Sequence, residues 1–196
     1  MNGAEGIISP PGVISLNKWT HIALVRHGDK RCLYVDGRIV GSSNQRCLPY
    51  TLCSLSIGGS KGIYNYWYGQ QYSYSNFIGY IDEFRITRGF ARYKAAEFLP
   101  PAPEHTIIDS SPNQLIVQSN EMVVTPKQSK FGGYSGYFSG DKDFLEVESE
   151  DLVLGNGDFT IEMWIRPISY PTNAIFVSGP RAGDPDNSGI MLGVSN

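Results

Sequence analysis

CLYVDGRIVG, residues 32–41, is the stretch that decides the fold class. Two runs of bulky residues flank Asp36-Gly37, and Asp-Gly between such runs is the strongest short signal for a β-hairpin. Just before it, Trp19–Val25 (WTHIALV) alternates enough bulky side chains to be a buried strand. The sequence therefore predicts an antiparallel sheet that starts early in the chain.

Further short apolar or alternating runs are bounded by Gly, Pro, Asn and Ser, as strands between tight turns are. They predict strands at Gly6–Ser9, Leu52–Ile57, Gly79–Thr87, Asn113–Val117, Met122–Thr125, Ser135–Ser139, Phe144–Val147, Phe159–Arg166, Ile175–Ser178 and Gly189–Val194. Lys61–Phe77 is predicted to be a long surface loop, and only Ala91–Phe98 predicts a helical turn. With 22 Gly, 12 Pro and 12 Tyr in 196 residues, the chain is typical of an all-β protein.

The composition argues against two classes of partner. A net charge of −3 with scattered Lys and Arg gives no basic surface for nucleic acid. No apolar run reaches the roughly 18 residues of a membrane span, and no signal peptide is expected at the N-terminus. Three cysteines are an odd number, so reduced thiols are expected, although a Cys47–Cys53 or a Cys32–Cys47 bridge remains open.

Several motifs resemble a laminin G-like module of the concanavalin A-like lectin superfamily. Four of them, at Asn17–Arg26, Leu33–Gly37, Ser56–Gly59 and Gly79–Thr87, resemble the second half of such a module in letters and spacing. Two others, at Lys130–Val147 and Gly157–Pro167 (GDFTIEMWIRP), resemble its first half. The resemblance implies a concanavalin A-like antiparallel β-sandwich of the jelly-roll type.

The two halves stand in the reverse of the family order, as in a circular permutation. Residues 1–101 resemble the C-terminal half, residues 102–108 form a linker, and residues 109–196 resemble the N-terminal half. Because sandwich termini usually lie close together, a single permuted sandwich over residues 1–196 is expected. Two alternatives stay open: a cut across two tandem repeats, and a swapped dimer in which halves of two chains complement each other.

The segment Arg85–Pro101 (RITRGFARYKAAEFLPP) is similar to the ends of repeats in phage tail-fibre and bacterial surface proteins. This resemblance implies a virion or extracellular surface location, with neighbouring repeats or copies of the chain as partners. The expected function is a non-catalytic carbohydrate-binding or adhesion module that recognises a glycan or cell-surface polysaccharide. The alternative is a purely structural repeat that mediates assembly without a ligand.

Catalysis is not expected, because glycoside hydrolysis needs two carboxylates facing one groove. The chain has no E-x-D-x-x-E pattern, and Asp82 and Glu83 are adjacent, so they would point to opposite faces of a strand. Glu146 and Glu148 share a face that is predicted to be turned toward solvent. His21 is interpreted as a structural residue of a buried strand.

The predicted ligand site is the aromatic segment within Lys61–Phe77. Aromatic rings there alternate with amides in a Gly- and Ser-rich stretch, where no strand period would bury them all. Rings can stack on sugars while amides bond to hydroxyls, and the competing interpretation is packing of the segment against itself or a neighbouring repeat. The candidate ligand residues are Tyr64, Tyr66, Trp67, Tyr68, Gln70, Tyr72, Tyr74 and Asn76.

A structural calcium ion is implied by the resemblance, since related sandwiches often bind Ca²⁺ through several oxygen ligands. Asp82 stands at the position that the resemblance nominates, and Asp109 and Asp141 are its candidate partners. No other cofactor is expected.

Overall fold

The computed structural model describes residues 7–44, 54–59, 63–65, 70–72, 77–100, 117–141, 143–148, 152, 154, 157–170, 173–179 and 190–194. These residues form strands and loops and contain no α-helix. In the N-terminal part the strands are β1 (Thr20–His27), β2 (Lys30–Val35), β3 (Arg38–Ser43), β4 (Ser54–Ile57), β5 (Ile63–Asn65), β6 (Gln70–Tyr72) and β7 (Ile78–Arg88). In the C-terminal part they are β8 (Val117–Asn120), β9 (Val123–Thr125), β10 (Ser135–Ser139), β11 (Phe144–Glu148), β12 (Phe159–Pro167), β13 (Asn173–Gly179) and β14 (Ile190–Val194).

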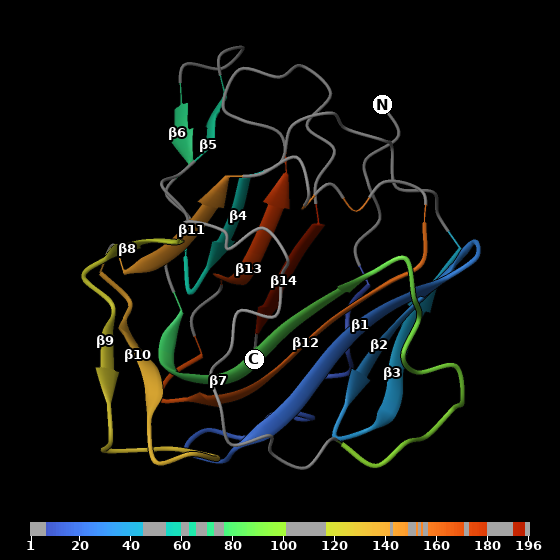
Figure 1. Ribbon diagram of the computed structural model, residues 1–196, viewed down its shortest axis with the longest axis horizontal. Coiled ribbons are helices and arrows are strands. Elements are labelled where there is room, and N and C mark those ends of the chain that lie inside the picture. The colour runs from blue at the N-terminus through green and yellow to red at the C-terminus, as the bar shows by residue number, and fades with distance from the viewer. Residues whose placement is uncertain are drawn as a thin grey trace.

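Two antiparallel sheets make the sandwich (Figure 1). The larger sheet has the order β3-β2-β1-β12-β7-β10-β9, and the smaller has the order β14-β13-β4-β11-β8. A separate two-stranded sheet, β5-β6, joins neither of them. The predicted all-β fold is thereby confirmed, with the two sheets stacked as in a concanavalin A-like sandwich.

Strands from the two ends of the chain alternate within both sheets. In the larger sheet β12 lies between β1 and β7, with Ile22 opposite Met163 and Ile86 opposite Ile161. In the smaller sheet β4 lies between β11 and β13. Neither sheet can therefore be completed by one half of the sequence alone.

The main core lies between the sheets. Alternate residues of the central strands point into it, which is why the strands carry the period-two pattern of the sequence. Ile161, Met163 and Ile165 of β12 are each 0% exposed and pack with Ile22 and Leu24 of β1. Burial of these aliphatic side chains is the main source of stability.

A second, smaller core covers the outer face of the larger sheet. Residues 89–100, here called the strap, follow β7 and cross over β1 and β2. Ala91, Tyr93 and Phe98 of the strap pack on Ala23 and Tyr34. The helical turn predicted at Ala91–Phe98 is therefore wrong: Glu97 instead forms a β-bridge with Arg38, and the Phe98 ring packs on the buried Tyr34 ring of β2.

Some of the predicted strands and turns are confirmed by the structure, and others are wrong. The hairpin at Asp36-Gly37 is confirmed, and its turn residues have φ of 46° and 80°, as a tight turn of this kind requires. The strand predicted at Gly6–Ser9 is wrong, because residues 7–9 are not in a strand; the Ile7 side chain instead packs beside Gly41 of β3. The predicted loop at Lys61–Phe77 contains the β5–β6 hairpin, and the strand predicted at Asn113–Val117 begins only at Val117 within the described residues.

Two further findings concern the cysteine residues and membrane-spanning helices. Cys32 is buried and free, so the Cys32–Cys47 bridge is not formed, while Cys47 and Cys53 lie outside the described residues. Within the described ranges, no helix is long and apolar enough to cross a membrane.

Candidate functional site

The aromatic segment begins and ends at one point of the sandwich. The Phe77 amide donates a hydrogen bond to the Gly58 carbonyl oxygen at 2.8 Å, and the Gly58 amide donates to the Ile175 carbonyl at 2.7 Å. Phe77 is 0% exposed and belongs to the main core. Residues 59–76 are therefore an excursion between β4 and β7 whose base is closed by a backbone hydrogen bond.

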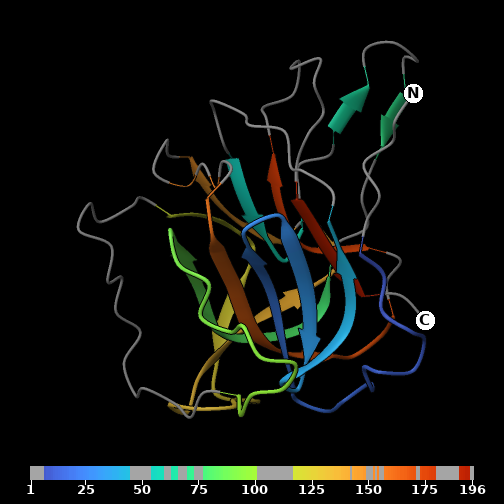
Figure 2. The same ribbon diagram turned by 90° about the vertical axis from the view of Figure 1, so that its right-hand side faces the viewer.

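The excursion carries the β5–β6 hairpin away from the two sheets, as Figures 1 and 2 show from two sides. Its register places Ile63 opposite Tyr72, Tyr64 opposite Gln71 and Asn65 opposite Gln70. Three candidate ligand residues, Tyr64, Gln70 and Tyr72, are thus brought together on paired strands. The other five, Tyr66, Trp67, Tyr68, Tyr74 and Asn76, lie outside the described residues.

Asp82, the first residue of the predicted calcium site, has a carboxylate that already accepts hydrogen bonds from the protein backbone. Its Oδ2 accepts hydrogen bonds from the amides of Lys130 and Phe131 at 2.9 and 3.1 Å, and its Oδ1 accepts one from Glu83 at 2.9 Å. These contacts sit at a β-bulge in β7, where Glu83 has a φ of 51°. Asp82 therefore anchors the loop that precedes β10.

Asp141 lies at the other end of β10. Because Gly136 pairs with Ile81, Asp82 is beside the start of β10, whereas Asp141 follows its last residue, Ser139. Four residues of strand separate these ends by about 13 Å, so the two carboxylates cannot share an ion. Asp109 lies outside the described residues, and in the part of the chain that is described no three His, Cys, Asp or Glu side chains are grouped to hold a metal ion.

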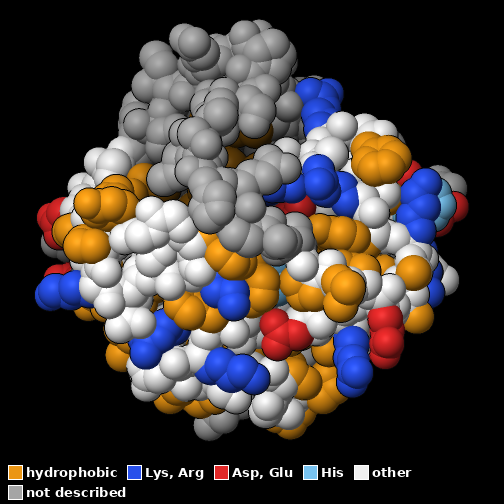
Figure 3. All heavy atoms as spheres, turned by 60° about the horizontal axis from the view of Figure 1, so that its bottom comes forward, with side chains coloured by type: hydrophobic (Ala, Val, Ile, Leu, Met, Phe, Trp, Pro, Cys, Tyr) orange, Lys and Arg blue, Asp and Glu red, His pale blue; other side chains and the backbone are white. Residues whose placement is uncertain are grey.

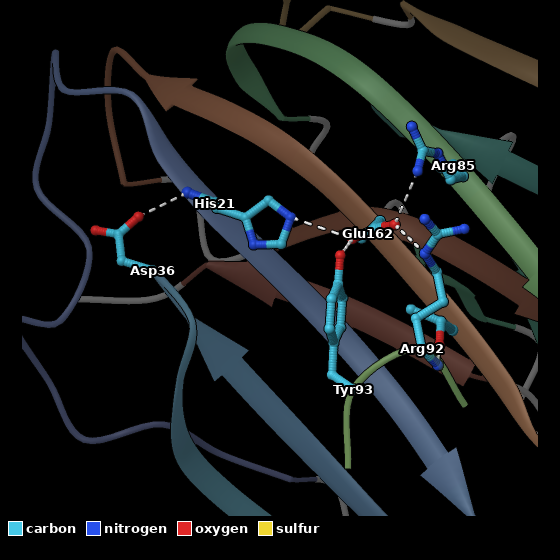
Figure 4. A network of polar contacts seen from close by, with 7 residues as sticks. His21, Asp36, Arg85, Arg92, Tyr93 and Glu162 are labelled. Atoms are coloured by element: carbon cyan, nitrogen blue, oxygen red, sulfur yellow. Dashed lines mark hydrogen bonds and ion pairs between the residues drawn. The ribbon is translucent and has the colours of Figure 1, made fainter. Parts of the chain in front are cut away.

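A buried polar network, which the sequence analysis did not find, lies beneath the strap (Figure 4). Its centre is Glu162 of β12, a carboxylate that is only 2% exposed. The Tyr93 hydroxyl donates to Glu162 Oε2 at 2.5 Å, and His21 Nε2 lies 3.4 Å from the same oxygen. Arg92 Nε and Arg85 Nη1 lie 3.3 and 3.7 Å from Oε1.

The network holds Glu162 in its ionised form. Burial alone would raise the pKa of Glu162, but the contacts with the His21 ring and the Tyr93 hydroxyl and the charge of Arg92 outweigh it, so the pKa lies below its usual value. Burial and the adjacent carboxylate raise the pKa of Tyr93, which keeps its hydroxyl protonated as a donor. Glu162 is thus a permanent anion at neutral pH.

Aromatic rings enclose this network. The rings of Tyr93 and Phe98 stack with centroids 3.5 Å apart, and His21 meets Phe98 and Trp164 edge-on at 5.8 and 5.3 Å. The backbone of His21 is fixed by Asp36, whose Oδ1 accepts from the His21 amide at 2.9 Å. The predicted structural role of His21 therefore has a defined basis: it fills the space between strap and sheet beside Glu162.

One local signal could have indicated the network. Glu162 is the only charged residue inside the otherwise apolar and Thr-containing run FTIEMWI, residues 159–165. A carboxylate in the middle of a strand buried on both faces must be compensated by partners from elsewhere. Those partners, Arg92 and Tyr93, lie about 70 residues earlier, where no pattern connects them with β12.

The burial of the β11 carboxylate Glu146 differs from the prediction. Glu146 is 9% exposed and therefore buried, not turned toward solvent, while nothing is described of the Glu148 side chain. Phe144, on the same face of β11 as Glu146, is also buried, at 7% exposed, so this face of the strand is not turned toward solvent.

Comparison with known proteins finds one family model that matches part of the chain. Residues 2–90 match the family model described as the Concanavalin A-like lectin/glucanases superfamily, which confirms the resemblance for the segment that carries β1 to β7. No curated protein and no solved structure matches the chain. Proteins of this superfamily commonly mediate binding, and the antiparallel two-sheet architecture agrees with the match. The fold of the chain is a concanavalin A-like β-sandwich.

Proposed function

We propose that the chain is a non-catalytic carbohydrate-binding or adhesion module of a phage tail fibre or surface protein, exposed on a virion or cell surface. One observation carries the proposal: the chain leaves the sandwich after Gly58 and rejoins it at Phe77, where the two residues are joined by a hydrogen bond, and the described strands between them, β5 and β6, join neither sheet. Neither sheet needs this excursion for its pairing. A segment that the fold does not require and that is rich in Tyr, Trp and amides is suited to a surface function.

The chemistry of the excursion favours a glycan as the ligand. Tyr and Trp rings stack on the apolar faces of sugar rings, while Asn and Gln side chains exchange hydrogen bonds with hydroxyls. The segment from Tyr64 to Asn76 supplies both kinds of group in alternation and no Lys, Arg, Asp or Glu. A neutral glycan fits this composition.

Glu162 supports a non-catalytic function. A glycosidase acid must hold its proton at neutral pH, which requires a raised pKa, and it needs a second carboxylate across the sugar. The pKa of Glu162 is lowered, and its oxygens face His21, Tyr93 and two arginines under the strap. Its arrangement is that of a structural anion.

A structural calcium ion stays a prediction. The hydrogen bonds to Asp82 from three backbone amides fix this carboxylate without a metal, and Asp141 is too distant to join it. Binding measured with and without EDTA tests the ion independently of the glycan.

An assembly repeat is the second candidate. It is favoured by β9, which forms the edge of the larger sheet and exposes Val123 and Val124 to 53% and 60%. An exposed apolar edge strand can pair with the edge of another copy. In that case the purified chain would associate with itself and bind no sugar.

A glycan-array experiment with the purified chain distinguishes the two functions. The test variant is Tyr66→Ala/Trp67→Ala, and the matched control is Tyr134→Ala, which removes an aromatic side chain that is 55% exposed on the turn between β9 and β10. The proposal expects specific glycan binding that the test variant loses and the control keeps. Absence of binding to every glycan, together with self-association, would favour the assembly repeat.

A further inference from the structure

A row of side chains crosses the outer face of the larger sheet, away from both the excursion and the strap. The register pairs Arg166 of β12 with Tyr80 of β7, Tyr80 with Tyr137 of β10, and Tyr137 with Val123 of β9. We call these four residues the tyrosine row. Because adjacent strands are about 4.8 Å apart, the row extends over about 14 Å, long enough for a short oligosaccharide.

The tyrosine row faces outward because its sequence neighbours face the core. Ile81, Phe138 and Ile165 are 5%, 1% and 0% exposed and belong to the main core, and strand residues alternate between faces. Tyr80, Tyr137 and Arg166 are partly exposed, and Val123 is exposed. The bottom of Figure 1, where the larger sheet lies, comes forward in Figure 3 and shows hydrophobic side chains interspersed with Lys and Arg and with some Asp and Glu.

The rings and the cation of the row are in contact. The Tyr80 and Tyr137 ring centroids are 5.1 Å apart at an interplanar angle of 42°, and the Arg166 guanidinium carbon lies 5.8 Å from the Tyr80 centroid. Arg166 is thereby held at one end of an aromatic platform. Among the described residues its guanidinium has no carboxylate partner within ion-pair distance.

A second cation lies on the same face. Lys130 Nζ is 4.2 Å from the centroid of Trp164, which precedes Arg166 by two residues on β12 and so shares its outward face. Lys130, like Arg166, contacts rings and no described carboxylate. Two cations that rest on aromatic rings can still attract an anion from solution.

Two carboxylates near these cations, Asp82 and Glu162, already have partners within the protein. Asp82, opposite Trp164, accepts hydrogen bonds from three backbone amides, and Glu162 is held by Arg85 and Arg92. Arg166 and Lys130 therefore lie on this face as two cations that contact aromatic rings and no described carboxylate, which favours an anionic ligand.

We propose that the tyrosine row is a second binding surface, specific for an acidic polysaccharide whose sugar rings carry carboxylates. The carboxylate binds the Arg166 guanidinium as a charge-assisted hydrogen-bonded pair, and the neighbouring rings stack on Tyr80 and Tyr137. The ligand class is related to that of the proposed function, but the site is separate from the excursion and does not depend on it.

Titration calorimetry on the full chain at physiological ionic strength tests this surface with four probes: polygalacturonate, its methyl ester, dextran sulfate and dextran. The test variants are Arg166→Gln and Tyr137→Leu. The matched control is Arg38→Gln, which removes the same charge from an arginine that is 76% exposed on β3 and paired only with the surface residue Glu97. Far-UV circular dichroism and urea unfolding establish that each variant is folded.

We expect wild type to bind polygalacturonate and to bind its methyl ester, dextran sulfate and dextran much more weakly. Arg166→Gln weakens polygalacturonate binding about tenfold or more, Tyr137→Leu weakens it as well, and Arg38→Gln leaves it unchanged. The variant Tyr66→Ala/Trp67→Ala also keeps it, which separates this surface from the excursion.

Four results would overturn the proposal: no binding of polygalacturonate, equal binding by Arg166→Gln and wild type, an equal loss in Arg38→Gln, or equal affinity for dextran sulfate. The last two would show attraction to charge in general. None of the four affects the glycan-array result for the excursion.

Discussion

The Tyr93 hydroxyl donates a 2.5 Å hydrogen bond to Glu162 Oε2 across 69 residues of sequence. Tyr93 belongs to the strap that follows β7, and Glu162 lies in the middle of β12. The bond therefore joins the end of the N-terminal part of the chain to the central strand supplied by the C-terminal part. The donor is an uncharged hydroxyl on an aromatic ring, so one atom can be removed without disturbing the aromatic packing.

Tyr93→Phe tests this bond. Phenylalanine keeps the stacked ring beside Phe98 but leaves the buried Glu162 oxygen without its donor, so we expect a loss of about 1.5–3 kcal/mol in the free energy of unfolding. Urea denaturation measures it. Tyr134→Phe, at an exposed position, is the control and should change the free energy by less than about 0.5 kcal/mol. Equal effects of the two substitutions would contradict the assigned role of Tyr93.

The lowered pKa of Glu162 predicts how stability depends on pH. A depressed folded pKa means that the ionised carboxylate stabilises the fold above its usual value of 4.5, and that this contribution is lost as pH falls through the folded pKa. Glu162→Gln lacks this titration, so its unfolding free energy should vary less between about pH 5 and pH 3. Asp158, whose pKa is also lowered by hydrogen bonds from His27 and the Gly28 amide, is present in both proteins. Parallel curves for the two proteins would disprove the assignment.

Gly58 is required at the base of the excursion. Its φ is +81°, and a Cβ atom at this position would lie 2.0 Å from the Phe138 ring in the main core. We expect Gly58→Ala to cost about 2 kcal/mol or more, from backbone strain and overpacking together. Gly28, with a φ of +59° and open space around it, provides the control, because Gly28→Ala adds only the backbone strain of about 1 kcal/mol. Thermal unfolding that ranks the two variants in the opposite order would contradict this packing.

Removal of the excursion separates binding from folding. Replacing residues 60–76 with a short Gly-Ser linker keeps Gly58 and Phe77 and leaves the pairing of both main sheets intact. We therefore expect a change in stability of only about 1 kcal/mol, together with complete loss of array binding. A shortened chain that fails to fold would show that the excursion is part of the core.

The sequence predicts those parts of the fold that depend on local pattern. Phe159–Arg166 and Ser135–Ser139 are found as strands because their alternation matches the pleat, and Asp36-Gly37 is found as a turn because both residues tolerate positive φ. The strap is mistaken for a helical turn, because its path depends on the contact of its own Phe98 ring with Tyr34 of β2, which is distant in sequence.

The candidate sites likewise divide into one that a local sequence pattern indicates and two that no local pattern indicates. Composition alone marks the excursion, because aromatic residues gather there without a strand period. By contrast, the Glu162 network and the tyrosine row each combine side chains from three or more elements far apart in the sequence. They exist only once β12 is inserted between β1 and β7, and no single segment carries their signature.

The mass of the chain in solution tests most directly whether one molecule supplies both halves of the sandwich. In this structure β12 pairs with β1 and β7 of its own chain, which predicts a monomer of 21.7 kDa by sedimentation equilibrium at all concentrations. A dimer of twice that mass that persists on dilution, and that Val123→Lys/Val124→Lys at the β9 edge does not dissociate, would contradict the account, because β12 would then complete the sheet of a second copy.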